Sequence, residues 1–153
     1  MSFDSFEGIL RFAIEREREA IEFYEGLSRR EAFSGTRETF LAFAREEKKH
    51  ETLLQDFLKG EKSFTEYDFR WVPDLKRSDY TVDMAYEEGM GYADLLRLAM
   101  KREEASLKLY NELAGKVSRD DLLRIFQMLS QEEAKHKLAL ESLYDDYMAK
   151  QGD

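Results

Sequence analysis

The sequence predicts an all-α protein, a four-helix bundle made of two repeated antiparallel helical hairpins joined by a long crossover. Charged residues make up 37% and hydrophobic residues 42% of the 153 residues, with a single proline, which is typical of long solvated helices. Four segments have inward-facing residues spaced alternately by three and four positions, as on one face of a helix. The two halves also match at a constant offset, as from Glu17 to Glu103.

Each hairpin consists of two helical segments separated by a short turn. Ser34-Gly35-Thr36 interrupts the first pair, and Gly115 follows the third segment as an expected C-terminal cap. Short turns make the two helices of each pair antiparallel neighbours. The four helices are expected at about residues 3–28, 36–59, 92–114 and 118–148.

The stretch between the hairpins, residues 60–91, differs from the rest of the chain. It contains Pro73 and only a short candidate helix near 82–88. This stretch is far longer than a turn between neighbouring helices requires. We expect it to cross the length of the bundle, so that the second and third helices run parallel. Residues 1–153 are then expected to form one domain, with hairpins at about 3–59 and 92–148.

The repeat between the halves extends over about fifty residues, which is most of each hairpin. The offset from Glu17 to Glu103 recurs from His50 to His136, which are the only two histidines of the chain. Such a repeat predicts a duplicated hairpin, and two copies packed about a pseudo-two-fold axis would build a symmetric site. The other pairs at this offset are Tyr24 and Tyr110, Leu27 and Leu113, Phe40 and Phe126, Glu46 and Glu132, and Glu47 and Glu133.

The composition excludes several classes of function. The chain has no cysteine, which excludes disulfides, thiolate metal sites and thiol catalysis. A net charge of −9 argues against a nucleic-acid or acidic-membrane partner. No apolar run is long enough to span a membrane, and the N-terminus lacks the features of a signal peptide. We therefore expect a cytoplasmic location.

Six ionisable residues occupy the inward-facing positions near the middle of the helices. Burial of an unpaired carboxylate costs several kcal/mol, and these positions include no lysine or arginine to neutralise four of them. Two divalent cations would neutralise the site. Carboxylates combined with imidazoles suit iron or manganese, and zinc less well. The six candidate metal ligands are Glu17, Glu47, His50, Glu103, Glu133 and His136.

The spacing also predicts that these residues lie at one level of the bundle. Glu17 and Glu47 are thirty residues apart and their midpoint falls in the predicted turn, so an antiparallel pair places them opposite each other. His50 shares a helix face with Glu47. The same relations hold in the second hairpin. The preceding glutamates, Glu46 and Glu132, fall to one side and are expected to be solvated or to support a ligand from outside.

Two further pairs flank the six residues. Tyr24 and Tyr110 lie two turns beyond the first glutamate of each hairpin, and helical side chains lean toward the N-terminus. Their hydroxyls are therefore expected to hydrogen-bond a ligand carboxylate. Ala20 and Ser106 lie one turn beyond the same glutamates. Their small side chains would leave a pocket for an oxidant, although close helix packing explains them equally well.

This pattern resembles the ferritin-like di-iron carboxylate proteins, in which two helices each supply a Glu and two others each supply Glu-x-x-His. It is most similar to the rubrerythrin branch, through Glu17-x-x-Ala20-x-x-x-Tyr24 and the repeat of this motif from Glu103. The resemblance covers the four helices. It implies two iron ions (Fe²⁺/Fe³⁺) with an oxo or hydroxo bridge, reaction with hydrogen peroxide or dioxygen, and a homo-oligomer, with a dimer expected.

Two departures qualify the resemblance. Rubrerythrins carry a rubredoxin-like module with CxxC pairs, whereas this chain has no cysteine, so electrons would come from a separate donor protein. Rubrerythrins also have an extra carboxylate three residues after the third-helix glutamate, where this chain has Ser106. The six-ligand site is in this respect closer to that of bacterioferritin.

Three functions remain open on the sequence. The first is an oxidoreductase that reduces hydrogen peroxide or dioxygen in oxidative-stress defence. The second is a ferroxidase or iron-handling protein, which would assemble into a cage. The third is a metal-free helical interaction module, whose buried polar cluster would only specify helix register.

Overall fold

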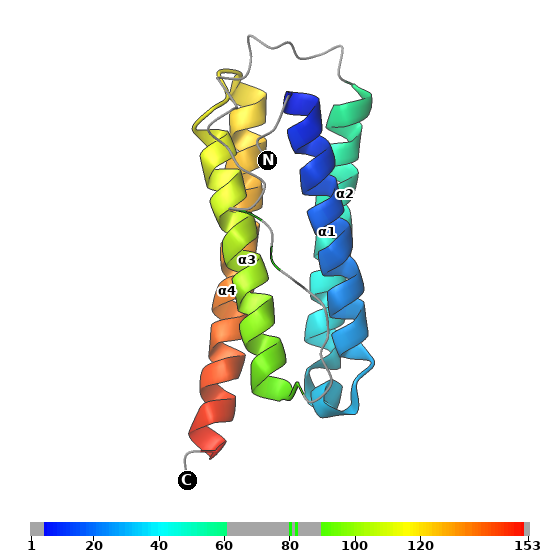
Figure 1. The fold of residues 1–153 in the computed structure, drawn as a ribbon, viewed down its shortest axis with the longest axis vertical. Coiled ribbons are helices and arrows are strands. Elements are labelled where there is room, and N and C mark those ends of the chain that lie inside the picture. Colours follow the sequence, from blue (N-terminus) through cyan, green and yellow to red (C-terminus); the bar gives the residue numbers. More distant parts are fainter. Residues whose placement is uncertain (1–4, 61–79, 81, 83–89, 152–153) are drawn as a thin grey trace.

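Four long helices account for most of the described chain. The computed structural model describes residues 5–60, 80, 82 and 90–151. This arrangement confirms the predicted all-α four-helix bundle (Figure 1). The elements are α1 (Phe6–Ser28), the 3₁₀ helix η1 (Glu31–Thr36), α2 (Arg37–Lys59), α3 (Tyr92–Ala114) and α4 (Asp120–Gln151).

Local interactions at the helix ends support these boundaries. Ser5 caps α1, because its hydroxyl oxygen accepts a 3.0 Å hydrogen bond from the Gly8 backbone N–H. The turn between α1 and α2 is held by Arg37, whose Nε donates to the Ser28 carbonyl at 2.9 Å. These contacts close the first hairpin and bring α2 back along α1.

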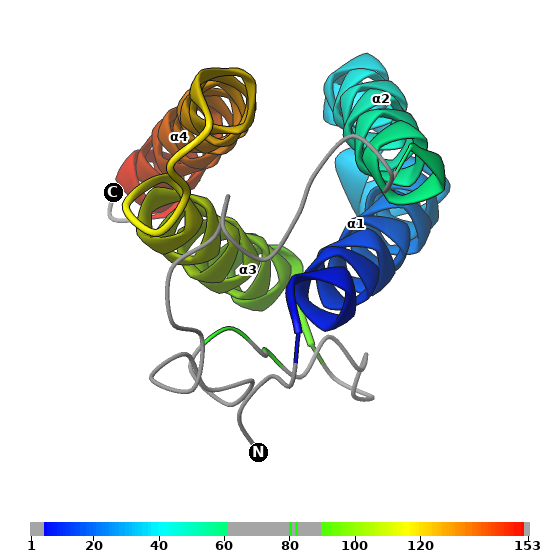
Figure 2. The same cartoon turned by 90° about the horizontal axis from the view of Figure 1, so that it is seen from above.

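The chain path matches the predicted crossover. The helices of each hairpin are antiparallel, and α2 and α3 run in the same direction along the bundle (Figure 1). Seen from above, the two hairpins diverge, with α1 and α3 nearer to each other than α2 and α4 are (Figure 2). Most of the crossover, and with it the predicted helix near 82–88 apart from Val82, lies outside the described residues.

The hydrophobic core has two parts. One part packs around Leu10, Leu113 and Phe126 at the end where α1 begins. The other packs around Tyr24 and Phe40 toward the opposite end. Each large side chain buried in this way contributes about 1.5–3 kcal/mol. The two parts lie toward opposite ends of the bundle, on either side of a middle layer that consists largely of polar side chains.

None of the helices in the described part of the chain has a segment long and apolar enough to cross a membrane.

Candidate metal centre

The middle layer of the bundle contains all six residues that the sequence singles out as candidate ligands. They come from the four long helices and point toward the bundle axis. None has more than 5% of its surface exposed. The exposed fraction is 0% for Glu17, Glu47, Glu103 and Glu133, 5% for His50 and 2% for His136.

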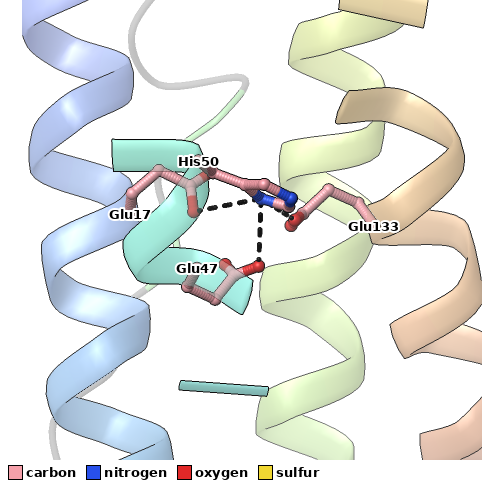
Figure 3. A group of neighbouring side chains, drawn as sticks. All are labelled: Glu17, Glu47, His50 and Glu133. Atoms are coloured by element: carbon pink, nitrogen blue, oxygen red, sulfur yellow. Dashed lines mark ion pairs between the residues drawn. The ribbon is translucent and has the colours of Figure 1, made fainter. Parts of the chain in front are cut away.

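The first group of ligand atoms is centred on His50. Its Nδ1 lies 3.1 Å from Glu133 Oε1, 3.3 Å from Glu47 Oε1 and 3.7 Å from Glu17 Oε2 (Figure 3). One oxygen or nitrogen atom of each of these four residues lies within 4.8 Å of the others. Residues from α1, α2 and α4 therefore converge on a volume that a single cation can occupy.

The second group is centred on His136. Its Nδ1 lies 3.4 Å from Glu47 Oε1 and 3.4 Å from Glu103 Oε1. One oxygen or nitrogen atom of each of these three residues lies within 4.8 Å of the others. Glu47 belongs to both groups. Glu133, in contrast, belongs only to the first group.

Two tyrosines connect the hairpins across this layer. The Tyr24 hydroxyl donates to Glu103 Oε1 at 2.5 Å, and the Tyr110 hydroxyl donates to Glu17 Oε1 at 2.6 Å. Each tyrosine on one hairpin therefore holds the first glutamate of the other. Burial, together with the adjacent glutamates, raises the pKa of both phenols well above its usual value, so both hydroxyls remain protonated donors.

His136 is oriented by two residues of α2. Its Nε2 pairs with the Glu46 carboxylate, which leaves Nδ1 facing the other carboxylates. The Phe43 ring stacks on the imidazole with centroids 4.3 Å apart. Glu46 thus supports a candidate ligand from outside, whereas its repeat counterpart Glu132 lies 3.9 Å from Lys135.

Arg102 is the residue that the sequence analysis missed. The inward-facing positions themselves hold no lysine or arginine, but Arg102 reaches the carboxylates from a neighbouring position. The Arg102 side chain is 5% exposed, and its Nη1 lies 2.6 Å from Glu133 Oε2 and 2.7 Å from Glu47 Oε2. Its Cα lies beside the inward-facing positions of α3 rather than on them. A long arginine side chain can nevertheless extend sideways into the bundle.

The pKa values in the middle layer reflect the crowding of four carboxylates around Arg102 and the two histidines. Burial raises the pKa of Glu47 well above 4.5 and that of Glu103 to about 7. Burial acts in the same direction on Glu133, but Arg102 and His50 outweigh it and hold the Glu133 pKa well below 4.5. Burial disfavours the imidazolium of His136, yet Glu103 and Glu47 raise its pKa to about 11.

Several buried oxygen and nitrogen atoms of the middle layer have no hydrogen-bond partner. Buried polar atoms nearly always have a partner, so a concentration of unpartnered atoms indicates a missing ligand. The chemistry of these donors, hard oxygens with imidazole nitrogens, fits divalent iron or manganese. In the described chain, the buried ligand atoms without a hydrogen-bond partner are Glu17 Oε2, Glu47 Oε1 and Oε2, His50 Nδ1, Glu103 Oε2, Glu133 Oε1 and His136 Nδ1.

The two small residues expected near an oxidant pocket have different surroundings. Ala20 is fully buried and packs in the hydrophobic core. Ser106 lines a small cavity of about 10 Å³ beside Arg102, close to the least volume that holds one water molecule. The structure therefore places a cavity at Ser106, whereas Ala20 packs among core side chains.

Comparison with known proteins gives a family and a fold. The family model described as Rubrerythrin matches residues 8–144. A solved structure, "Hypothetical Protein Pfu-1136390-001" from Pyrococcus furiosus, is similar, with a TM-score of 0.75 and 28% identity over 93% of this chain and 89% of that chain. No curated protein matches significantly. With a match over nearly all of its length and a buried Glu/His cluster at mid-bundle, the chain belongs to the rubrerythrin family of ferritin-like di-iron carboxylate proteins.

Proposed function

We propose that this protein is an oxidoreductase that reduces hydrogen peroxide or dioxygen at a dinuclear iron site, as part of oxidative-stress defence. The observation that carries the proposal is the set of buried ligand atoms that lack a hydrogen-bond partner and that two cations would satisfy. Manganese or zinc could bind the same donors. The proposed ligands are Glu17, Glu47, His50, Glu103, Glu133 and His136.

Bound iron would supply the redox chemistry, in which two electrons and two protons convert one hydrogen peroxide to two water molecules. The surrounding residues hold the site in position. The hydroxyls of Tyr24 and Tyr110 fix one oxygen each of Glu103 and Glu17 and leave the other oxygen for a metal. Glu46 fixes the ring orientation of His136. The apolar core on either side of the layer limits access of water.

Electrons must reach the site from elsewhere, because the chain has no cysteine for an iron–sulfur module. We propose a separate electron-donor protein as the redox partner. Family membership also supports a homo-oligomer, and we propose a dimer.

A second candidate is a ferroxidase that oxidises Fe²⁺ and passes it on. It is favoured by Ser106, which stands where rubrerythrins have an additional carboxylate. Without that carboxylate, the site depends on six residues that are related by the internal repeat.

The two candidates can be separated in one experiment. The protein loaded anaerobically with two Fe²⁺ per chain is mixed with hydrogen peroxide and, separately, with dioxygen, and the absorption of the oxidised iron is followed. The experiment is repeated with excess Fe²⁺. Rapid oxidation by peroxide with uptake limited to two ions supports the oxidoreductase. Continued uptake beyond two ions per chain supports the ferroxidase, and failure to bind any iron contradicts both.

A further inference from the structure

Arg102 places one nitrogen atom among three carboxylates. Nη1 lies 2.6 Å from Glu133 Oε2, 2.7 Å from Glu47 Oε2 and 3.2 Å from Glu103 Oε1. The other terminal nitrogen, Nη2, lies 3.6 Å from Glu17 Oε2. A single cationic nitrogen surrounded by three converging oxygens occupies the kind of position that a metal ion takes in a carboxylate cluster.

This position corresponds to the second metal. The first group of ligand atoms comprises Glu17, Glu47, Glu133 and His50. The internal repeat exchanges the two hairpins, so its counterpart is the set Glu103, Glu133, Glu47 and His136. Arg102 Nη1 contacts the three carboxylates of this second set. Glu133 is nevertheless absent from the second group of ligand atoms. The position of Arg102 explains this asymmetry, because Glu133 Oε2 accepts a hydrogen bond from Arg102.

The repeat explains why Arg102 turns inward. Its counterpart is Arg16, which precedes Glu17 as Arg102 precedes Glu103. Arg16 is 21% exposed, pairs with Glu19 and lies 4.7 Å from the centroid of the Phe12 ring, so its guanidinium stays at the helix surface.

The positions that hold Arg16 outward are changed around Arg102. Ala105 stands where Glu19 stands in the first hairpin, and Leu98 stands in place of Phe12. Lys101 replaces Glu15, whose carboxylate lies 3.7 Å from Arg16. Positions 98, 101 and 105 therefore offer Arg102 no acidic side chain, and within the described part of the chain Arg102 pairs with the four buried glutamates.

We propose that Arg102 is an internal counter-cation that occupies the second metal position, so that the second ion binds only by displacing its guanidinium. This inference rests on the proposed function, because it concerns the same ligands. A first ion would be held beside His50 Nδ1 by Glu47 Oε1 and Glu133 Oε1, because Arg102 Nη1 contacts the other oxygen of each of these two carboxylates. Loading of the second ion is an exchange of one cation for another.

Arg102 borders a small cavity of about 10 Å³ that Arg16, Glu19 and Ser106 also line. Because the Glu19 carboxylate already pairs with Arg16, a guanidinium displaced toward this cavity would compete with Arg16 for that carboxylate.

The test is a calorimetric and spectroscopic titration with Co²⁺ of protein freed of metal by chelation. Wild-type protein is expected to bind two ions in two steps. In R102L the second ion should bind about tenfold or more tightly than in the wild type, because no cation must be displaced. The metal-free R102L protein should also unfold at a lower urea concentration, because four carboxylates lose their counter-cation.

Two further variants make the test specific. A105E gives Arg102 an outward carboxylate like the one that Glu19 offers Arg16. It should increase the affinity for the second ion although Arg102 is kept. If R102L does not fold, A105E alone tests the inference. R16L removes the counterpart arginine at the surface and should leave both steps unchanged. Second-ion affinities of R102L and A105E within about twofold of wild type would overturn the inference while the proposed function stands. If wild-type protein binds no Co²⁺, the proposed function itself fails.

Discussion

The Tyr24 hydroxyl donates a 2.5 Å hydrogen bond to Glu103 Oε1, which joins the first helix of one hairpin to the first helix of the other. The reciprocal bond from Tyr110 to Glu17 completes a crossed pair. The two glutamates on the narrower side of the bundle are therefore held in place from the opposite hairpin. The orientation of each glutamate thus depends on correct docking of the two halves.

Loss of either of these hydroxyls is expected to weaken metal binding. In Y24F or Y110F one glutamate oxygen loses its tyrosine donor and the carboxylate is held less firmly, and loss of such a supporting hydrogen bond typically costs about 10–100-fold in metal affinity. Calorimetric titration of the metal-free protein measures the effect. Y144F is the matched control, because that hydroxyl accepts from Arg97 in an exposed pair far from the layer. Equal affinities for all three variants and wild type would exclude the holding role.

Glu47 and Glu103 are expected to differ in their effect on the number of ions bound. Glu47 belongs to both groups of ligand atoms, so E47Q should reduce the affinity for both ions by about 100-fold or more. E103Q should weaken only the second ion. Metal content after gel filtration, measured by atomic emission, gives the number of ions per chain. E132Q serves as a control, since Glu132 lies near Lys135 outside the site. Loss of both ions in E103Q would contradict the two-group description.

The metal-free protein is expected to become less stable as pH rises. The pKa of His136 is about 11 when folded against an ordinary 6.5, so its stabilisation is complete below about pH 6.5 and is lost toward pH 11. Folding raises the pKa of Glu103 from 4.5 to about 7, so the folded state also loses stability as pH rises from about 4.5 to about 7. Glu133, whose pKa is lowered, loses its stabilisation only as pH falls below 4.5.

The measurement for this pH effect is the urea midpoint in the presence of a chelator from about pH 5 to about pH 9. The midpoint should fall over that range. With saturating metal the trend should reverse, because metal binding requires deprotonated ligands and becomes tighter as pH rises. A midpoint that rises with pH in the chelated protein would show that the buried carboxylates are not crowded as the structure indicates.

Removal of metal is expected to lower the melting temperature. A ligand that binds only the folded state at 100 times its Kd stabilises it by about 2.7 kcal/mol, and each of two ions adds such a contribution. Differential scanning calorimetry with and without chelator measures the change. If the chelated protein melts at the same temperature, and H50L or E47L raises that temperature further, the interaction-module function gains support over the metal-binding one.

The sequence by itself determined the helices, their pairing and the residues of the middle layer. Spacing by three and four places Cα–Cβ bonds on one helix face, and the constant offset from Glu17 to Glu103 relates the two hairpins. The length of residues 60–91 predicted parallel α2 and α3, as the structure shows. These features depend on backbone geometry, which local sequence patterns report directly.

The tertiary structure decided the features that depend on where long side chains end. Helical periodicity gives the direction in which a side chain leaves the backbone, but not the path of a flexible one. Arg102 leaves α3 beside the inward face, yet its guanidinium lies between Glu47 and Glu133. Likewise Glu46 starts outside the layer and pairs with His136 across the wide side of the bundle. Both depend on charges that only folding brings together, because buried ionic groups take the nearest partner of opposite sign.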